Sequence, residues 1–494
     1  MENNTYWKTI RTQFSKNKLG VFALFIVGLF CVVGIYAPFL ASSKPLWVDY
    51  DRQWWFPSFR YLFFIGFYTK GLDLFFNLLM FTTPLLLVSF FCLRRFPGWR
   101  KGIITAILVI QFALFGYFFY ARPKDPASDP ILNKERHLSL LNDQKEGRNA
   151  EWSDELRYMT PYAKLNALLR YRQLRAQNER IIKYQEKAPT LWQIDESNLT
   201  QKREHYEAVF NKETPTSAAY LRAKAQLEYL QDRKIWFQTE SSKLQDVVMP
   251  LIRDFHWEDD AGGDQSLNQK LPWWELTRIN RKDLVAALIF GVRISIVVGI
   301  LAVGLALLIS IPIGAYAGYY GGTFDILVSR LIEIWDSMPV FFMLLMIIAV
   351  TQNKSIFLVI AMIGFFGWTG FSRYIRGEFF KQRNLPYVEA CHAAGFRDSH
   401  IMFSHILPNA IPPVLTLIPF AVMGAITTEA ALSFLGLGEE GSTSWGTLMD
   451  EGRSAFPAES YLLWPPAILL TVLLVAIAVA GDALRDALDP KMHR

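Results

Sequence analysis

Several features that would mark an enzyme or a secreted domain are missing from this 494-residue sequence. It contains only three cysteines, and because none lies in the large polar segment, no disulfide framework is predicted. No G-x-x-x-x-G-K-[ST] pattern occurs, which argues against a phosphate-binding loop for ATP. The histidines show no metal-ligand spacing. We therefore expect no enzymatic activity, no metal and no cofactor.

Charge of one sign is not concentrated in any tract, although the formal net charge is +6. This distribution gives no support to nucleic-acid binding. Apolar residues make up 52% of the chain and aromatic residues 15%, but 19% of the residues are charged. Because a wholly membrane-embedded protein would carry less charge, a polar domain is expected among membrane-spanning segments.

Apolar runs long enough to cross a bilayer, which takes about 20 residues, predict eight spans. The first run, from Leu19 to about Leu40, is longer than a signal-peptide core, so we expect an uncleaved helix whose basic flank places the N-terminus in the cytoplasm. Runs 72–93 and 102–121 enclose a basic turn, although an interfacial hairpin would also explain them. Five further runs follow residue 284, and Pro339 is expected to kink the second of them.

The polar segment, residues 122–282, has helical periodicity. Thr160-Pro161 and Thr214-Pro215 are typical of helix starts and predict a helical hairpin, with a third short helix near 197–211. Counting spans from the N-terminus places this segment outside the cytoplasm. The predicted domains are a first helix with a Trp-rich interfacial segment (1–60), two further membrane helices (61–121), an extracytoplasmic helical insert (122–282) and a membrane core (283–494).

Residues 386–408, PYVEACHAAGFRDSHIMFSHILP, are polar although apolar runs lie on both sides. Lipid would not tolerate the charged and histidine side chains of this stretch, so it must lie outside the bilayer. The pattern predicts helix, break, helix. Pro386 suits the first turn of a short helix, and Gly395 is expected to break or cap it. We call this stretch the polar loop.

The polar loop resembles the EAA loop of permease subunits of binding-protein-dependent ABC importers. The matching residues are Glu389, Ala390, Cys391, Gly395, Leu407 and Pro408. His405 and Ile406 come directly before Leu407-Pro408. Cys391 and His405 depart from the commoner Ala and Ile. Further motifs occur in the family order, from G-x-R-I-S near residue 291 to G-D-x-L-R-D-x-L-D-P at the end. Together with the first helix, residues 284–494 resemble oligopeptide and dipeptide permease C subunits, and the Trp-rich residues 44–57 resemble Yej-type permeases.

The resemblance implies an all-α polytopic membrane protein with a MetI-like permease core, lying in the bacterial inner membrane with both termini in the cytoplasm. It implies a translocation path for oligopeptides or dipeptides. It also implies that Glu389, Ala390, Cys391, Gly395, Leu407 and Pro408 couple this path to separate cytoplasmic ATPase subunits. The other implied partners are a second permease subunit, an extracytoplasmic peptide-binding protein and membrane lipid.

Other functions stay open at this point. A secondary transporter would show repeated hydropathy halves and ionisable residues deep in the membrane, and neither is evident. A membrane-anchored interaction protein would explain the insert but not the polar loop. A permease for a non-peptide substrate such as a nickel chelate is equally compatible with the motifs. The insert is expected to contact the binding protein or to shield the translocation entrance, or else to be a decoration without a transport role.

Overall fold

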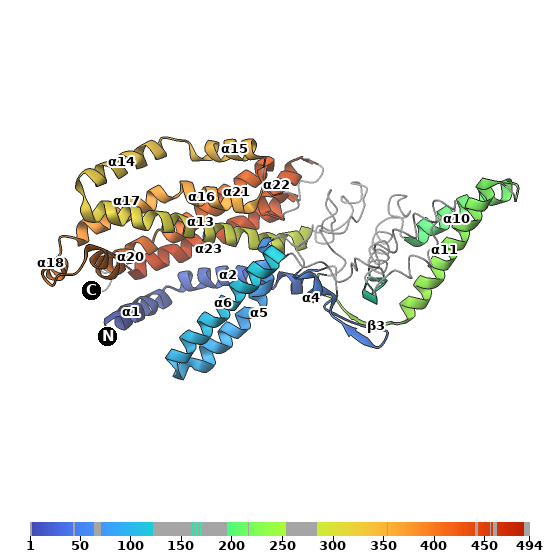
Figure 1. Ribbon diagram of the computed structural model, residues 1–494, viewed down its shortest axis with the longest axis horizontal. Helices are drawn as coiled ribbons and strands as arrows, with labels where there is room; N and C mark the ends of the chain where they lie inside the picture. The colour runs from blue at the N-terminus through green and yellow to red at the C-terminus, as the bar shows by residue number, and fades with distance from the viewer. Residues whose placement is uncertain are drawn as a thin grey trace. The chain divides into compact units, whose positions relative to one another are not determined.

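The computed structural model describes residues 2–42, 45–63, 71–121, 161–162, 164–165, 168–169, 195–215, 217–252 and 284–488, with gaps at 353, 440–442, 455 and 458–461. The chain divides into two compact units (Figure 1). The core unit comprises Met1–Gly34 and Ala287–Arg494, and the inserted unit comprises Ile35–Ala286.

The core unit is helical throughout its described residues. Figure 1 shows α18 at the same end of this unit as α1 and the C-terminal end of α23, with α22 at the opposite end. The elements are α1 (Glu2–Lys16), α2 (Lys18–Ile35), α13 (Leu284–Tyr320), α14 (Gly322–Asp336), α15 (Val340–Thr351), α16 (Ile356–Phe366), α17 (Trp368–Gln382), α18 (Pro386–Ala393), α19 (Asp398–His400), the π-helix η3 (Ile401–Ile406), α20 (Leu407–Leu415), α21 (Ile418–Leu432), the π-helix η4 (Ser433–Leu437), α22 (Trp445–Ser454) and α23 (Trp464–Leu488).

Seven helices of the described residues are long and apolar enough to cross a membrane. The count rises to eight if α14 and α15, which are bent by 70° at a short break, form one span. This upper count matches the eight predicted spans, and the break lies at Pro339, where the kink was predicted. The chain is therefore an α-helical, polytopic membrane protein.

Helix α13 packs closely on α17 through two glycines. A Cβ added at Gly314 would lie 2.7 Å from the Ser372 carbonyl oxygen, and one at Gly318 would lie 2.5 Å from the Phe379 Cβ. Any side chain larger than hydrogen would push the two helices apart. These glycines form a G-x-x-x-G pair, a pattern that permits close packing of membrane helices.

The inserted unit begins with α3 (Ala37–Leu40), α4 (Pro57–Tyr61), α5 (Gly71–Cys92), η1 (Leu93–Arg95) and α6 (Pro97–Ala121). The helices α5 and α6 are antiparallel neighbours (Figure 1). The hydroxyl of Thr82 on α5 donates to the side-chain oxygen of Gln111 on α6, and both residues are buried. This hydrogen bond links two polar side chains across a pair of apolar helices.

A three-stranded sheet in the inserted unit was not predicted. The Trp-rich segment folds as a hairpin of β1 (Trp47–Tyr50) and β2 (Gln53–Trp55), and β3 (Leu244–Val248) pairs antiparallel with β1. Asp51 and Arg52 adopt φ of 55° and 60°, as a two-residue hairpin turn with matching twist requires. The insert and the Trp-rich segment thus share one sheet.

A helical hairpin forms between α10 (Asp195–Lys212) and α11 (Ala218–Ser242), whose Phe210 and Tyr220 rings stack at 4.4 Å. Its first helix is the short third helix predicted near residues 197–211, and not the predicted partner after Thr160-Pro161. Its second helix starts later than predicted, because Ser217, not Thr214, accepts the capping hydrogen bond from the Tyr220 N–H at 3.1 Å. Thr160 lies outside the described residues. The described residues after Pro161 are helical, as predicted, and the Leu165 and Leu169 side chains pack against β1.

Candidate functional site

The polar loop has the predicted order of helix, break and helix. Helix α18 begins at Pro386, where the missing N–H costs no hydrogen bond. Val388 is buried and anchors the helix, whereas Glu389 and Ala390 are exposed and Cys391 is half-buried. The helix therefore presents small residues and one carboxylate to the surroundings. The carboxylate, that of Glu389, lies in the first turn, where the helix dipole favours negative charge.

Gly395 ends α18 in a left-handed conformation, with φ of 79°. The Gly395 N–H donates to the His392 carbonyl at 2.9 Å, and the Phe396 N–H donates to the Cys391 carbonyl at 3.1 Å. These two bonds make a Schellman motif, in which glycine avoids the steric cost of positive φ. Gly395 is exposed, and an added Cβ would meet nothing within 4 Å in this chain. The predicted helix cap is confirmed.

The second half of the polar loop is a π-helix, η3, which continues into α20 at Leu407 and Pro408. Its Ile401, Met402 and Ile406 side chains are buried, whereas Leu407 is half-buried and Pro408 is exposed. Two histidines of the polar loop lie side by side, although the sequence shows no metal-ligand spacing. The His400 and His405 ring centroids lie 5.2 Å apart, because the wider π register brings residues five apart to one side.

Two tyrosines at the end of α13 bind the polar loop. The Tyr319 hydroxyl donates to the Asp398 carboxylate at 3.0 Å and lies 3.1 Å from His392 Nε2. The Tyr320 hydroxyl contacts the second Asp398 oxygen at 3.5 Å. Since His392 is on α18 and Asp398 starts α19, these contacts join both halves of the loop to one membrane helix.

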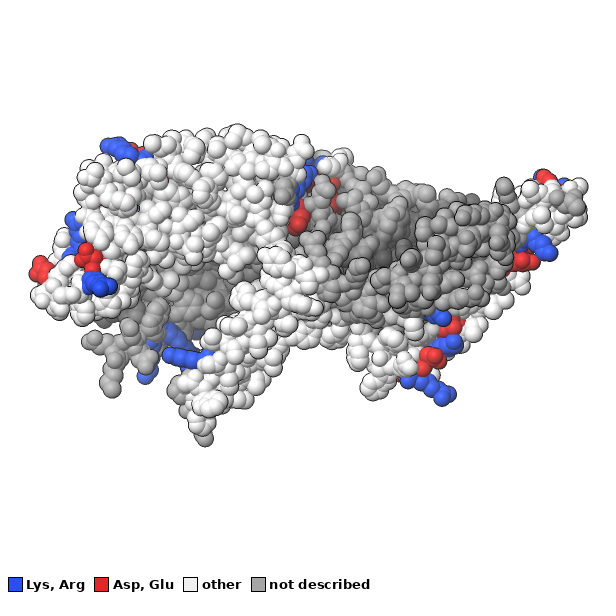
Figure 2. Space-filling model, viewed as in Figure 1, with Lys and Arg blue, Asp and Glu red and all other residues white. Residues whose placement is uncertain are grey.

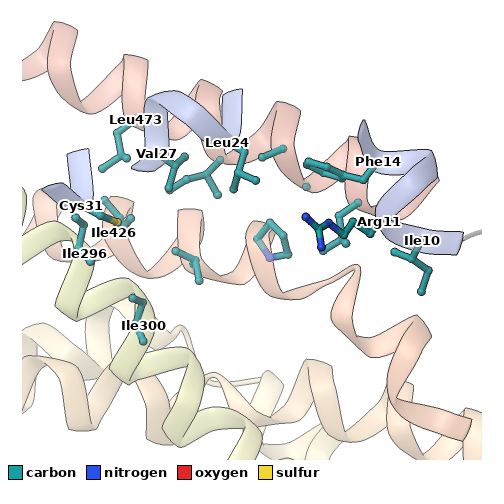
Figure 3. A pocket seen from close by; sticks show the side chains of 16 residues that line it. Ile10, Arg11, Phe14, Leu24, Val27, Cys31, Ile296, Ile300, Ile426 and Leu473 are labelled. Carbon is teal, nitrogen blue, oxygen red and sulfur yellow. The ribbon is translucent and has the colours of Figure 1, made fainter. Parts of the chain in front are cut away.

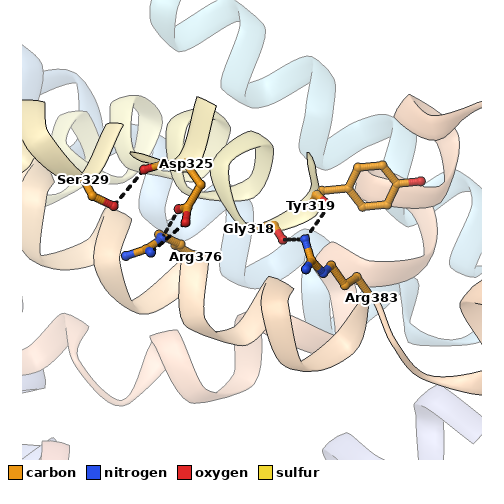
Figure 4. Close-up of polar contacts among 6 residues, drawn as sticks. All are labelled: Gly318, Tyr319, Asp325, Ser329, Arg376 and Arg383. Carbon is orange, nitrogen blue, oxygen red and sulfur yellow. Dashed lines mark hydrogen bonds and ion pairs between the residues drawn. The ribbon is translucent and has the colours of Figure 1, made fainter. Parts of the chain in front are cut away.

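Three arginines of α17 and the segment after it hold α13 and α14, and Figure 4 shows two of them, Arg376 and Arg383. Arg383 donates to the carbonyl oxygens of Gly318 and Tyr319 at 3.3 and 3.1 Å. Arg376 forms a two-pronged ion pair with Asp325 on α14, and Arg373 pairs with Asp336 at 2.5 Å. These three arginines thus supply hydrogen-bond donors to carbonyl groups at the end of α13 and to two carboxylates of α14.

The structure brings the predicted site residues to one loop but not to one cluster. Glu389, Ala390 and Cys391 lie on α18, Gly395 lies at its C-terminal end, and Leu407 and Pro408 lie beyond η3. The sequence analysis did not identify Tyr319, Asp398 and Arg383, whose hydrogen bonds hold the polar loop and the segment before it against the end of α13. The available signal was the G-Y-Y-G-G pattern, because tyrosine hydroxyls at the end of an apolar helix need partners.

Two further motifs of the family pattern, E-A-x-L-S-F-L-G-L-G at residues 429–438 and W-G at residues 445–446, lie at the opposite end of the core unit, around α22 (Figure 1). Glu429 is buried and accepts a hydrogen bond from the Ser433 hydroxyl at 2.7 Å. The Trp445 indole N–H donates to the Leu288 carbonyl at 3.0 Å, and an added Cβ at Gly446 would clash with the Ala430 carbonyl. These motifs therefore hold α22 against α13 and α21.

Figure 2 shows an uncharged band on the visible face of the core unit, between charged residues near α18 and others near α22. This distribution suits a unit that crosses a bilayer, with both charged ends in water. Among the described residues, no group of three or more His, Cys, Asp or Glu side chains could hold a metal ion.

Two family models match the chain. The model for the binding-protein-dependent transport system inner membrane component matches residues 310–494, and the model for the N-terminal TM domain of oligopeptide transport permease C matches residues 5–55. These two matches leave residues 56–309 uncovered.

Similar proteins carry names of transport permeases. The peptidoglycan transport system permease protein YejE of Agrobacterium fabrum is 38% identical over 44% of this chain, which spans 57% of that protein's length. The oligopeptide transport system permease protein OppC of Haemophilus influenzae is 38% identical over 50% of this chain and 79% of that protein. A chain of the MetNI methionine ABC transporter in an inward facing conformation is 17% identical, with a TM-score of 0.34, over 41% of this chain and 96% of that chain.

Proposed function

Because this chain belongs to the family of oligopeptide and dipeptide transport permease C subunits, we propose that it is a transmembrane permease subunit of a binding-protein-dependent ABC importer for peptides. The exposed, capped helix α18 carries this proposal, since it offers a soluble partner a small-residue surface beside the Glu389 carboxylate. No P-loop pattern occurs in the sequence, so ATP hydrolysis is assigned to separate cytoplasmic ATPase subunits.

The mechanism follows from the contacts of the polar loop. A short helix seated in a groove of the ATPase moves when the ATPase changes shape. The Tyr319–Asp398 hydrogen bond and the Arg383 contacts then pull on the end of α13, and the Arg376–Asp325 pair carries the movement to α14. Displacement of these helices opens the translocation path.

Location and partners follow from the same arrangement. The family places the chain in the bacterial inner membrane. The ends of α1 and α23 lie at the α18 end of the core unit, which puts both termini in the cytoplasm if α18 docks on the ATPase. A second permease subunit would complete the path, and a peptide-binding protein would deliver substrate from the other side. The inserted helices α10 and α11 are proposed to contact that binding protein.

The ATPase assignment is tested by copurification. Ala390→Trp adds a bulky side chain to the exposed face of α18 and should abolish copurification of the ATPase with the full chain. Leu327→Trp is the matched control, because Leu327 is 63% exposed on α14 and lies outside the polar loop. Equal ATPase recovery with both variants would overturn the assignment of α18 as the docking helix.

The proposed transmission of movement from the polar loop to α13 is tested by a variant that leaves ATPase docking intact. Tyr319→Phe removes the hydroxyl shared by Asp398 and His392, so uptake per ATP hydrolysed should fall about tenfold while the ATPase still copurifies; hydrogen bonds to charged groups contribute about 1.5–3 kcal/mol. Tyr316→Phe is the control, since the Tyr316 ring stacks on Tyr320 and packs on Phe403 but its hydroxyl has no partner among the described residues. Unchanged coupling in Tyr319→Phe would refute this transmission.

A further inference from the structure

An elongated apolar groove of about 470 Å³ lies within the core unit (Figure 3). This volume falls in the range of roughly 300–1,000 Å³ that small-ligand pockets occupy. Helices α1 and α2 form one wall, and α13, α21 and α23 form the other. Every lining side chain is apolar or a thiol except Arg11 of α1, which lies at one end, while Cys31 and Ile296 lie at the other (Figure 3).

The groove exists because α2 touches the rest of the core unit mainly at its two ends. Near the start of α2, an added Cβ at Gly20 would clash with Ala483 of α23. Near its end, Gly34 lies against Val292, and its carbonyl accepts a hydrogen bond from Arg293 Nε at 2.7 Å. Between these two contacts Leu24, Val27 and Cys31 line the gap. A second membrane-spanning helix could not run along this gap without breaking one contact.

The length of the groove matches one leaflet of a bilayer. Along α23 its lining runs from Leu473 to Leu484, and at about 1.5 Å per residue this corresponds to roughly 16 Å. The hydrocarbon region of a whole bilayer is about 30 Å thick, so the groove follows about half of it. An extended acyl chain of a single lipid has this reach and this apolar character.

The charge at the Arg11 end of the groove favours anionic lipids. Arg11 lines the groove there, and Lys8, Lys16 and Lys18, all exposed, lie on the same helix or at the start of α2. The acidic side chains nearest in the lining helices are Asp482 and Asp486 of α23, which are also exposed. A basic residue near a membrane surface attracts anionic headgroups by about 1 kcal/mol, and this attraction falls off within a Debye length. The residue that lines the groove therefore contributes most to a headgroup held there.

We propose that this groove binds one acyl chain of an anionic phospholipid from the leaflet on the α1 side, with the headgroup phosphate at Arg11. The chain fills the gap between α2 and the core helices, so the lipid is a structural ligand that fastens the first membrane helix. This site is separate from the polar loop, and it does not depend on the transported substrate.

The proposal is tested on the full chain with its co-expressed partner subunits, reconstituted in nanodiscs of equal phosphatidylglycerol and phosphatidylethanolamine. Lipids retained after transfer to a mild detergent are counted by native mass spectrometry. The wild type should retain phosphatidylglycerol in preference to phosphatidylethanolamine. Arg11→Gln should lower that retention about fivefold, which corresponds to about 1 kcal/mol for one basic residue at a membrane surface. Lys16→Gln, with the same charge change on the same helix but outside the groove, should lower it much less.

A second pair of variants tests the acyl chain. Val27→Phe fills the groove and should abolish retention of the lipid, whereas Val32→Phe, at a 53% exposed position of the same helix, should not. Equal retention in Arg11→Gln and Lys16→Gln would overturn the headgroup assignment. A photoreactive side chain at position 27 that forms adducts with a partner subunit, and none with phospholipid, would show that protein and not lipid fills the groove.

Discussion

The polar loop and the α10–α11 hairpin are both helical excursions away from the apolar helices, but they are attached in different ways. The polar loop is bound along its length, by Val388 and η3 in the core and by the Tyr319 hydroxyl at its middle. The hairpin is attached at its base, where β3 pairs with β1 and the Tyr50 hydroxyl donates to Glu240 at 2.6 Å. A segment bound throughout transmits movement, whereas one bound at its base presents a surface.

The largest expected difference between these two segments is the side of the membrane on which they lie. In a chain whose three cysteines are replaced by serine, Glu228→Cys on α11 and Ser399→Cys on α19 introduce thiols at exposed positions. An impermeant maleimide should label the first in intact spheroplasts and the second only after the membrane is broken. Labelling of both from the same side would contradict the proposed topology.

Gly395→Asp should abolish peptide uptake while the chain remains inserted. The substitution strains a backbone at φ of 79°, at a cost of roughly 1–2 kcal/mol for a residue with a side chain, and places a charge on the docking face. Gly98→Asp, at an exposed glycine near the start of α6 with nothing within 4 Å of an added Cβ, should leave uptake unchanged. Gly395→Asn has nearly the same size and the same tolerance of positive φ as Gly395→Asp but carries no charge. Restored uptake in Gly395→Asn would mean that the charge, and not a side chain on the docking face or backbone strain, explains the loss.

Removing the hairpin should have a milder, severalfold effect. Replacing residues 195–242 by a flexible linker keeps β3, and with it the partner of β1, so that Val48 and Tyr50 stay covered. The concentration of binding protein needed for half-maximal uptake should then rise severalfold, with unchanged insertion and maximal uptake. If that concentration does not change, the hairpin is a decoration without a transport role.

The smallest expected effect concerns the base of the hairpin. Burial raises the pKa of Glu240, but hydrogen bonds from Lys243 and Tyr50 outweigh it and hold the pKa below its ordinary value. The stabilisation is therefore present above the unfolded-state pKa of about 4.3 and is lost as the pH falls below it. Hydrogen exchange of the β3 amides, corrected for intrinsic rates, should accelerate below that pH in the full chain but not in Glu240→Gln. Glu207→Gln, which removes an exposed pair with Arg203, should behave as wild type.

Much of the fold could be predicted because apolar length and capping chemistry act locally. The membrane helices, the bend at Pro339 and the role of Gly395 each depend on a few neighbouring residues. The sheet could not be predicted, because β1 and β3 are almost 200 residues apart and the Trp-rich segment is equally suited to a membrane interface. The hydrogen bond from Tyr319 to Asp398 also joins segments that are distant in the sequence. The contact between His400 and His405 depends on a π-helix, which no local sequence pattern predicts.

The 70° bend between α14 and α15 determines whether the number of membrane crossings is counted as odd or even. Helix α13 ends at the α18 end of the core unit, and the span made of α16 and α17 also ends there after running back from the α22 end (Figure 1). Helices α14 and α15, which lie between these two spans and meet at Pro339, must therefore cross the membrane once together. Neither helix alone has the roughly 20 residues that a straight span needs. A method that counts only straight spans would find an odd number and assign the two termini to opposite sides. Counted as one crossing, the bent pair makes the number even and brings both termini to the same side.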